Sequence, residues 1–157
     1  MHKVNRKIEY ALMALKFMSG KMPGQLTQVK EICEKTGSPF DATARVMQQM
    51  VHAEVLKSVQ GAYGGYLIVK DLSKVSFYDL AKIVLGKIEL AKCLHGDHKC
   101  ELAGSCNIVA PMNEFNNKLM GFYKTLTLVE LLVPSSVDKT KSVDASLNSQ
   151  VGGAHEF

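Results

Sequence analysis

The chain has 157 residues, a hydrophobic fraction of 46% and a formal net charge of +4, which suits one globular domain with a core of its own. No apolar run reaches the roughly eighteen residues of a membrane span, and the N-terminus lacks the apolar centre of a signal peptide. We therefore expect a cytoplasmic protein without a membrane partner. Residues 1–70 hold ten basic and five acidic side chains, a local excess that permits a nucleic-acid partner.

Two helices are expected first, over residues 4–19 and 28–36, because apolar residues recur at helical spacing in both segments. A stretch that contains glycine and proline separates them. Thr27 can cap the second helix. Cys33 falls on the inner face of that helix, as a small buried residue. Gly37 ends the helix in the position that favours glycine.

A third helix should run from Pro39 to about His52, with Ser38 as its cap and proline in the favoured first position. Two short helices joined by a tight turn indicate a helix-turn-helix, whose second helix reads base edges in a major groove. A solvated face without a ligand is the alternative. The outward face should carry Asp41, Ala44, Arg45, Gln48 and Gln49. The candidate DNA contacts in this region are Thr27, Ser38, Pro39, Asp41, Ala44, Arg45 and Gln48.

Two β-rich runs, 55–59 and 66–69, flank a glycine-rich tip and predict a hairpin. A hairpin directly after a helix-turn-helix is a wing, and its glycines let the backbone approach a phosphate or the floor of a minor groove. A nucleotide-binding loop fits poorly, because no Gly-Lys-Ser/Thr follows. The candidate DNA contacts of the wing are Gln60, Gly61, Ala62 and Tyr63.

Ser76 and Asp79 indicate a variant capping box that opens a helix to about Leu85. After Pro111, apolar residues in steps of three and four predict one long helix with a heptad-like seam. The position of this helix beyond the winged domain favours a dimerisation helix, and packing within one subunit is the alternative. The seam consists of Met112, Phe115, Leu119, Phe122, Leu126 and Val129.

These elements predict a mainly α fold with a small β-hairpin wing. The winged helix-turn-helix should span residues 1–75. The cysteine loop and the dimerisation helices should span 76–133. The polar residues 134–157 lack periodicity and are expected to form a flexible tail.

Three of the four cysteines lie within fourteen residues, in the order C-x6-C-x5-C. Thiolates on one short polar loop can point at a common centre, as an iron–sulfur cluster or a zinc ion requires. Structural zinc sites usually carry tight C-x2-C pairs, which this loop lacks, so the spacing favours a cluster. Zinc and redox-active or inert thiols stay open as alternatives. The three residues are Cys93, Cys100 and Cys106.

Residues 1 to about 133 resemble the IscR-type winged-helix regulators, which include the nitric-oxide sensor NsrR and the iron regulator RirA. The most specific parts are Tyr10-Ala11, Val59-x-Gly61-x-x-Gly64-Gly65-Tyr66, the cysteine trio with Cys106-Asn107, and Thr127-Leu-Val-Glu-Leu131. The resemblance implies a homodimeric transcriptional regulator, not an enzyme, that binds double-stranded operator DNA. It also implies that Cys93, Cys100 and Cys106 hold an iron–sulfur cluster, 4Fe–4S or 2Fe–2S, whose loss or modification changes operator affinity.

The sequence departs from this family in three places. Six residues instead of five separate the first two cysteines, Gln60 replaces a wing arginine, and Val109 stands where IscR-like members carry a histidine. The fourth ligand is therefore open. In NsrR-like members an acidic residue of the partner subunit completes the site, and Glu9 matches its position. His95 and His98 are local alternatives, and water, an exogenous thiol or no fourth ligand at all also stay open. The rival functions are a cluster-free, thiol-based redox regulator of the same fold and an iron–sulfur electron-transfer protein.

Overall fold

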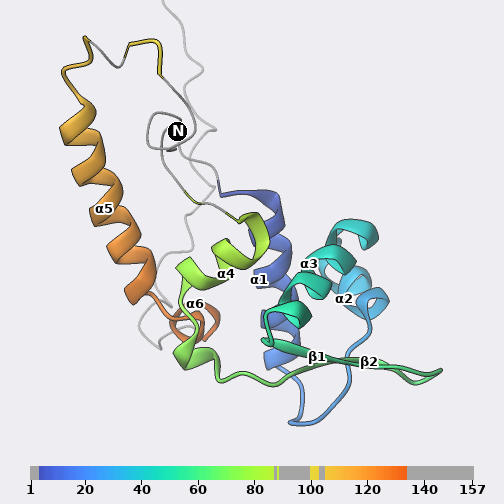
Figure 1. The fold of residues 1–157 in the computed structure, drawn as a ribbon. Coiled ribbons are helices and arrows are strands. Elements are labelled where there is room, and N and C mark those ends of the chain that lie inside the picture. Colours follow the sequence, from blue (N-terminus) through green and yellow to red (C-terminus); the bar gives the residue numbers. More distant parts are fainter. Residues whose placement is uncertain (1–3, 87, 89–99, 103–104, 134–157) are drawn as a thin grey trace, which may run out of the picture.

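The structure, a computed structural model, describes residues 4–86, 88, 100–102 and 105–133. The two strands pair as an antiparallel hairpin, with Leu56 opposite Ile68 and Val59 opposite Gly65. This arrangement confirms the predicted mainly α fold with a two-stranded wing. The elements in chain order are α1 (Arg6–Ser19), α2 (Val29–Thr36), α3 (Phe40–His52), β1 (Leu56–Val59), β2 (Gly65–Ile68), the 3-10 helix η1 (Leu72–Lys74), α4 (Phe77–Leu85), α5 (Val109–Thr125) and α6 (Leu128–Leu132) (Figure 1).

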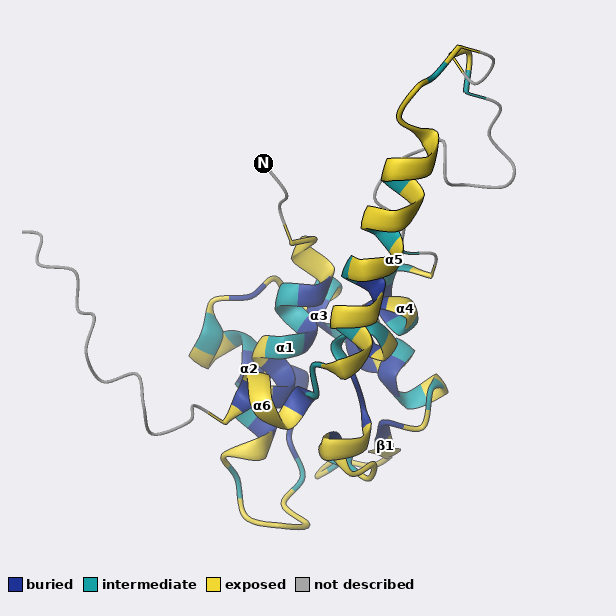
Figure 2. Ribbon diagram, turned by 90° about the vertical axis from the view of Figure 1, so that its left-hand side faces the viewer, coloured by how far each residue is buried: buried dark blue, intermediate teal, exposed yellow. Residues whose placement is uncertain are grey.

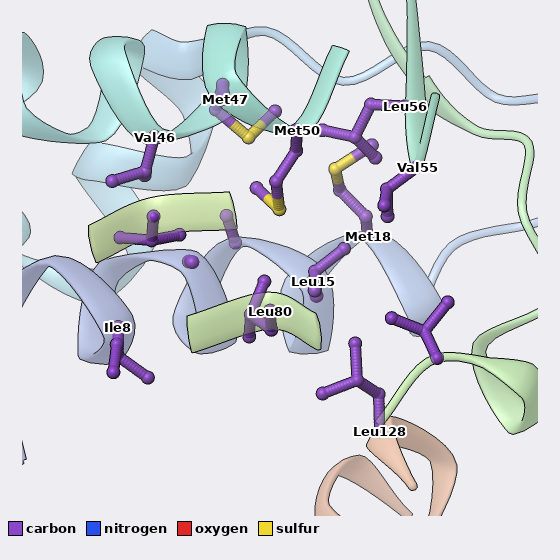
Figure 3. Close-up of a cluster of buried hydrophobic side chains, with 14 of the residues drawn as sticks. Ile8, Leu15, Met18, Val46, Met47, Met50, Val55, Leu56, Leu80 and Leu128 are labelled. Carbon is purple, nitrogen blue, oxygen red and sulfur yellow. The ribbon is translucent and has the colours of Figure 1, made fainter. Parts of the chain in front are cut away.

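The core is built around α1, which lies between the two helices of the helix-turn-helix, α2 and α3, and α4 (Figure 1). Both ends of the described chain contribute to the core, because α6 inserts Leu128 and Leu132 into the same cluster. The ammonium of Lys16 on α1 also donates to the Leu132 carbonyl at the end of α6. Each apolar side chain that is fully buried in this core stabilises the fold by about 1.5–3 kcal/mol. Figure 3 labels Ile8, Leu15, Met18, Val46, Met47, Met50, Val55, Leu56, Leu80 and Leu128 of this core.

The helix-turn-helix forms, but the two predicted caps are wrong. Gln28, not Thr27, is the N-cap of α2, and no side chain caps that helix. Pro39 is the N-cap of α3, again without a side-chain cap. The Ser38 hydroxyl is buried and accepts hydrogen bonds from the hydroxyls of Thr36 (2.9 Å) and Thr43 (3.0 Å). The Ser38 hydroxyl is therefore held inside the turn, and the Thr27 hydroxyl is buried without a hydrogen-bond partner among the described residues.

Two other local predictions are confirmed. Gly37 ends α2 with φ 72°, a left-handed conformation that favours glycine. Ser76 and Asp79 form the capping box that begins α4, since the Ser76 hydroxyl accepts from the Asp79 N–H and the Asp79 carboxylate accepts from the Ser76 N–H.

None of the described helices is long and apolar enough to cross a bilayer.

The predicted seam is interrupted, because α5 ends at Thr125 and a separate helix, α6, carries Val129. Leu126 is extended, and its carbonyl accepts from the Phe77 N–H at 2.7 Å. Thr127 then opens α6 with its own capping box. This backbone pairing with the start of α4 replaces the helical hydrogen bonds that a continuous helix would need. The seam of one long helix through Val129 is therefore wrong, whereas its part from Met112 to Phe122 lies on α5.

Most of α5 stands away from the core and is exposed (Figure 2). Met120 is its one buried residue among those described. Phe115 and Phe122 are 54% and 57% exposed. Such large apolar side chains, repeated along one helix, leave an uncovered apolar surface in the single chain.

Candidate nucleic-acid interface and cysteine loop

The wing is tied to the start of α2 by a short backbone bridge. The Thr27 N–H donates to the Tyr66 carbonyl at 3.0 Å, and the Tyr66 N–H donates to the Thr27 carbonyl at 2.9 Å. The Gln28 amide also donates to the Gly64 carbonyl at 3.3 Å. These bonds hold the hairpin at a defined place beside the helix-turn-helix, although its tip projects away from the helices (Figure 1).

The exposed face of α3 carries Asp41, Arg45, Gln48 and His52. These positions follow one another in steps of three and four, so they form one stripe along the helix. Thr43, Val46 and Met50 are buried on the opposite side, as predicted, and Met47 is buried with them. The stripe offers carboxylate, guanidinium, amide and imidazole groups, which are the side chains that read base edges or hold phosphates.

Four of the predicted positions do not lie openly on this face. Thr27 is fully buried, and Ser38 is 7% exposed within its hydroxyl cluster. Ala44 is half-buried and packs against the core. Gln49 is half-buried, and its amide donates to the Val84 carbonyl of α4 at 3.4 Å. Burial of Thr27 and Ser38 leaves no side-chain atom free for a surface ligand, so these two are not carried into the contact set proposed below.

The wing tip presents Gln60, Gly61, Ala62 and Tyr63 to solvent, and Tyr63 is 92% exposed. Gly61 has φ 117°, which only glycine adopts without strain. A Cβ at Gly64 would lie 2.3 Å from the Val59 carbonyl oxygen, so the turn also needs glycine there. The tip is thus a tight, exposed turn with one aromatic ring on it.

Two basic or ionisable side chains join this surface that were not among the predicted contacts. Lys7 of α1 lines a depression beside α3 together with Asp41, Arg45 and His52. His52 also lines a second depression, between α3 and the hairpin, with Gln48 and wing residues. Lys7 could not be found from sequence, because only the packing of α1 on α3 brings it there. His52 could have been found from its helical spacing to Gln48.

The cysteine loop lies only partly within the described residues. Cys100 and Cys106 are half-buried free thiols, and Cys106 lies three residues before α5 begins. Cys93, His95 and His98 lie outside the described residues, so the predicted ligand trio stays a prediction. Among the described residues, no group of three His, Cys, Asp or Glu side chains is arranged to hold a metal ion.

Glu9 and Cys33 have other surroundings. The Glu9 carboxylate lies on α1 and accepts from the Arg6 guanidinium at 3.3 Å. Cys33 lies inside the helix-turn-helix, half-buried against the core, where its sulfur accepts from the Ser38 hydroxyl at 3.7 Å. Its packing agrees with the predicted structural role.

The chain matches the Rrf2 family, described as an iron-dependent transcriptional regulator, over residues 4–134. It is 28% identical over 127 residues to an HTH-type transcriptional regulator of Aquifex aeolicus, covering 80% of this chain and 88% of that protein. It is 23% identical over 130 residues to the HTH-type transcriptional regulator IscR of Escherichia coli, covering 83% and 80%. The structure of CymR, the global cysteine regulator of B. subtilis, shares the fold, with a TM-score of 0.64 at 20% identity over 84% of this chain and 97% of CymR. Because the family match spans most of the chain, this protein belongs to the Rrf2 family of DNA-binding transcriptional regulators.

Proposed function

We propose that this Rrf2-family regulator is a homodimer whose affinity for double-stranded operator DNA is controlled by an iron–sulfur cluster. The observation that carries the proposal is the trio Cys93, Cys100 and Cys106 within one short loop. The description of the matched family as iron-dependent supports it. A structural disulfide would need an oxidising compartment. Clustered cysteines in a transcriptional regulator are better explained as metal ligands or reactive thiols.

Operator DNA is read by α3 in a major groove and by the wing tip against the adjacent backbone or minor groove. The half-buried Ala44 is left out together with Thr27 and Ser38. The exposed contacts that we carry forward are Pro39, Asp41, Arg45, Gln48, Gln60, Gly61, Ala62 and Tyr63. Arg45 is the arginine of the exposed stripe, and an arginine can bind guanine bidentately. Arg45→Ala should cost about 1–3 kcal/mol on operator DNA if it makes a base contact. Equal loss on random DNA would make it a phosphate contact, and no loss on either would contradict the assignment of α3.

The donor chemistry fits a cluster. Cys100 and Cys106 carry free thiols that are neither fully buried nor hydrogen-bonded into the core, and thiolate sulfur is the usual protein ligand of iron–sulfur clusters. Cys93 would be the third ligand. When bound, the cluster supplies iron that nitric oxide, oxygen or iron shortage can attack or remove.

Glu9 of the partner subunit is the proposed fourth ligand. A carboxylate is a harder ligand than a thiolate and holds such iron less firmly, which suits a sensor. We use the term reading head for the winged helix-turn-helix of one subunit, residues 1–75. A link from the cysteine loop of one subunit to α1 of the other would set the spacing of the two reading heads. Half-sites have a fixed spacing, and a coupling of about 1–3 kcal/mol changes occupancy roughly 5- to 150-fold.

Purification without oxygen, with iron and sulfide counted, tests the cluster directly. The wild-type protein should be brown, and Cys93→Ala, Cys100→Ala or Cys106→Ala should each abolish the colour. Cys33→Ala is the matched control and should keep it, since Cys33 belongs to the reading head. A colourless wild type, or loss of iron from the Cys33 variant alone, would overturn the ligand assignment.

The fourth ligand is tested by Glu9→Ala against the double change His95→Ala, His98→Ala. Glu9→Ala should leave folding intact, because its ion pair with Arg6 is at the surface and contributes little. It should weaken cluster retention, and Glu9→Cys should strengthen it. If the histidine variant loses the cluster while Glu9→Ala keeps the wild-type spectrum, the ligand is a local histidine.

A cluster-free thiol regulator is the alternative that a specific observation favours, namely the shared fold with CymR, described as a global cysteine regulator. Such a protein would bind no iron and would change operator affinity when its cysteines are oxidised. An electron-transfer role is less consistent with an exposed reading helix and wing. Salt-dependent binding of duplex DNA separates the regulators from an electron carrier.

A further inference from the structure

His52 occupies a central place on the reading surface. It is the last residue of α3, its side chain is exposed, and it lines the depressions on both sides of that helix. The depression toward α1, of about 560 Å³, also contains Lys7 and Arg45. The depression toward the hairpin also contains Gln60 at the wing tip. A DNA backbone that passes between α3 and the wing would therefore run beside the imidazole.

Charged and titratable groups from several elements line the two depressions beside His52. On α1 the group is the Lys7 ammonium, and on α3 the groups are Arg45 and Asp41. From the hairpin, the titratable group in the lining is the Tyr66 phenol, and Glu54 lies two residues further along the chain. His52 forms no ion pair with a carboxylate among the described residues. The cations Lys7 and Arg45 are balanced by the carboxylates Asp41 and Glu54. Because neither carboxylate is paired with His52, its imidazole is open to an external anion.

We propose that His52 is a DNA-phosphate contact and that it binds as the imidazolium. The proposal rests on the DNA interface proposed above. An imidazole changes charge near pH 6.5, and a phosphate oxygen beside it favours the charged form. Operator binding then takes up a proton at this residue.

The direction of the pH effect follows from proton uptake. Affinity gained from the imidazolium is complete below the range in which a free imidazole titrates and is lost as the pH rises through the titration of the bound form. The gain should be roughly two- to fivefold, the range of one solvent-exposed ion pair. Because each phosphate contact releases counterions, the slope of log affinity against log salt should also steepen by about one in acid.

The test compares wild type, His52→Gln and His52→Lys at about pH 5.5 and about pH 8, on either side of the imidazole titration. The probes are a duplex selected from a random pool by the wild-type protein and a random-sequence duplex of equal length. Wild type should bind both probes more tightly, and with the steeper salt slope, at the lower pH. His52→Gln should lose that difference, and His52→Lys should bind at both values with the steep slope. Cluster content is matched between samples by absorbance, and melting curves at both values check folding.

The outcomes are distinguishable. If His52→Gln keeps the full pH effect on the salt slope, another group takes up the proton and the proposal is overturned. A wild-type slope that does not change with pH also overturns it, while the DNA interface stands if Arg45→Ala still weakens binding. Failure of the wild type to bind any duplex at either pH would overturn both proposals together.

Discussion

Thr27 and Tyr66 exchange two backbone hydrogen bonds, of 3.0 and 2.9 Å, and this pair joins the wing to the start of α2. The approach is so close that residue 65 has no room for a side chain. A Cβ on Gly65 would lie 2.8 Å from the Thr27 carbonyl oxygen and 3.0 Å from its carbonyl carbon. Both are backbone atoms, which cannot yield as the end of a flexible side chain can.

Gly65→Ala should therefore destabilise the protein by about 1–3 kcal/mol, as overpacked sites do, and should move the wing relative to α3. Urea unfolding measures the first effect and affinity for operator DNA the second. Gly121→Ala is the control, because a Cβ there meets nothing within 4 Å in the described structure and Gly121 lies inside α5. Alanine is the better helix residue by roughly 1 kcal/mol. Equal stability of the two variants would show that the backbone pairing of Thr27 with Tyr66 can shift enough to admit a Cβ at residue 65.

The Thr27 hydroxyl is buried and has no hydrogen-bond partner among the described residues. Removing an unpaired buried polar group relieves a desolvation cost of about 1–3 kcal/mol. Thr27→Val keeps the shape, so it should leave the free energy of unfolding unchanged or raise it, and it should leave operator affinity as it is. A loss of DNA affinity without a loss of stability would return Thr27 to the contact set.

Lys21, two residues beyond the end of α1, forms a partly buried ion pair with Glu31 of α2. The Lys21 Nζ lies 2.6 Å from the Glu31 carboxylate, and the two side chains are 12% and 41% exposed. The ammonium also lies 5.2 Å from the centre of the Phe17 ring. Glu31→Gln would leave this ammonium without a full counter-charge.

We expect Glu31→Gln to cost about 1–2 kcal/mol, between the values for surface and buried pairs. Glu34→Gln, on the same helix, removes an exposed pair with Lys30 whose charged atoms are 3.9 Å apart, and it should change stability by less than about 0.5 kcal/mol. Thermal unfolding of both variants in low and moderate salt provides the comparison. Identical melting curves for the two would refute the partly buried pair.

Ser76 and Asp79 couple the start of α4 to pH. Partial burial raises the pKa of the Asp79 carboxyl, but hydrogen bonds from the Ser76 hydroxyl and N–H outweigh that effect, so the pKa lies below its ordinary value of 3.8. A lowered pKa means that the unfolded chain binds this proton first as pH falls. The contribution of Asp79 is therefore present above the ordinary value and is lost as the pH falls through the lowered one.

Ser76→Ala should cost about 1 kcal/mol at neutral pH through loss of the cap. It should also flatten the decline of stability below about pH 4, where Asp79 titrates. Unfolding curves across that range, for wild type and variant, measure both effects. An unchanged acid slope in the variant would assign the acid sensitivity to other carboxyl groups.

Phe122 is more than half exposed on α5 in the single chain, and Leu119, one turn before it, is half-buried. If this face is the dimer contact, Leu119→Asp with Phe122→Asp places charges in a buried interface at a cost of several kcal/mol each. Sedimentation should then show a monomer. Met22→Asp, at an exposed position outside the seam, should stay dimeric. A dimeric double variant would mean that the two protomers meet elsewhere.

Local chemistry explains which elements could be predicted from sequence. Gly37, the glycines of the wing tip and the capping box at Ser76 depend only on residues close to them in the sequence. Their roles could therefore be predicted from the sequence. Thr27 and Ser38 have the same capping chemistry, but both are buried, Thr27 beside the wing and Ser38 against the hydroxyls of Thr36 and Thr43, and the prediction failed there. The break at Leu126 had a local signal, because Thr127 and Glu130 have the spacing of a capping box. Its backbone pairing with Phe77, far back in the sequence, could not be predicted.

The candidate site divides in the same way. The stripe on α3 follows from helical spacing, whereas the withdrawal of Ala44 and Gln49 depends on the core and on α4. Lys7 reaches the reading surface only through the packing of α1 on α3. The cysteine trio is a strong pattern in the chain, and it stays a prediction because Cys93 lies outside the described residues.

The insertion of α6 into the core bears on how this protein can be cut or fused. Leu128 and Leu132 of α6 pack in the core beside α1, and the Lys16 ammonium donates a hydrogen bond to the Leu132 carbonyl at the end of α6. A fragment that stopped after the wing would open this face of the reading head to water. Reporter fusions and truncations meant to isolate DNA binding are therefore best placed after Val133, where the last helix is already seated.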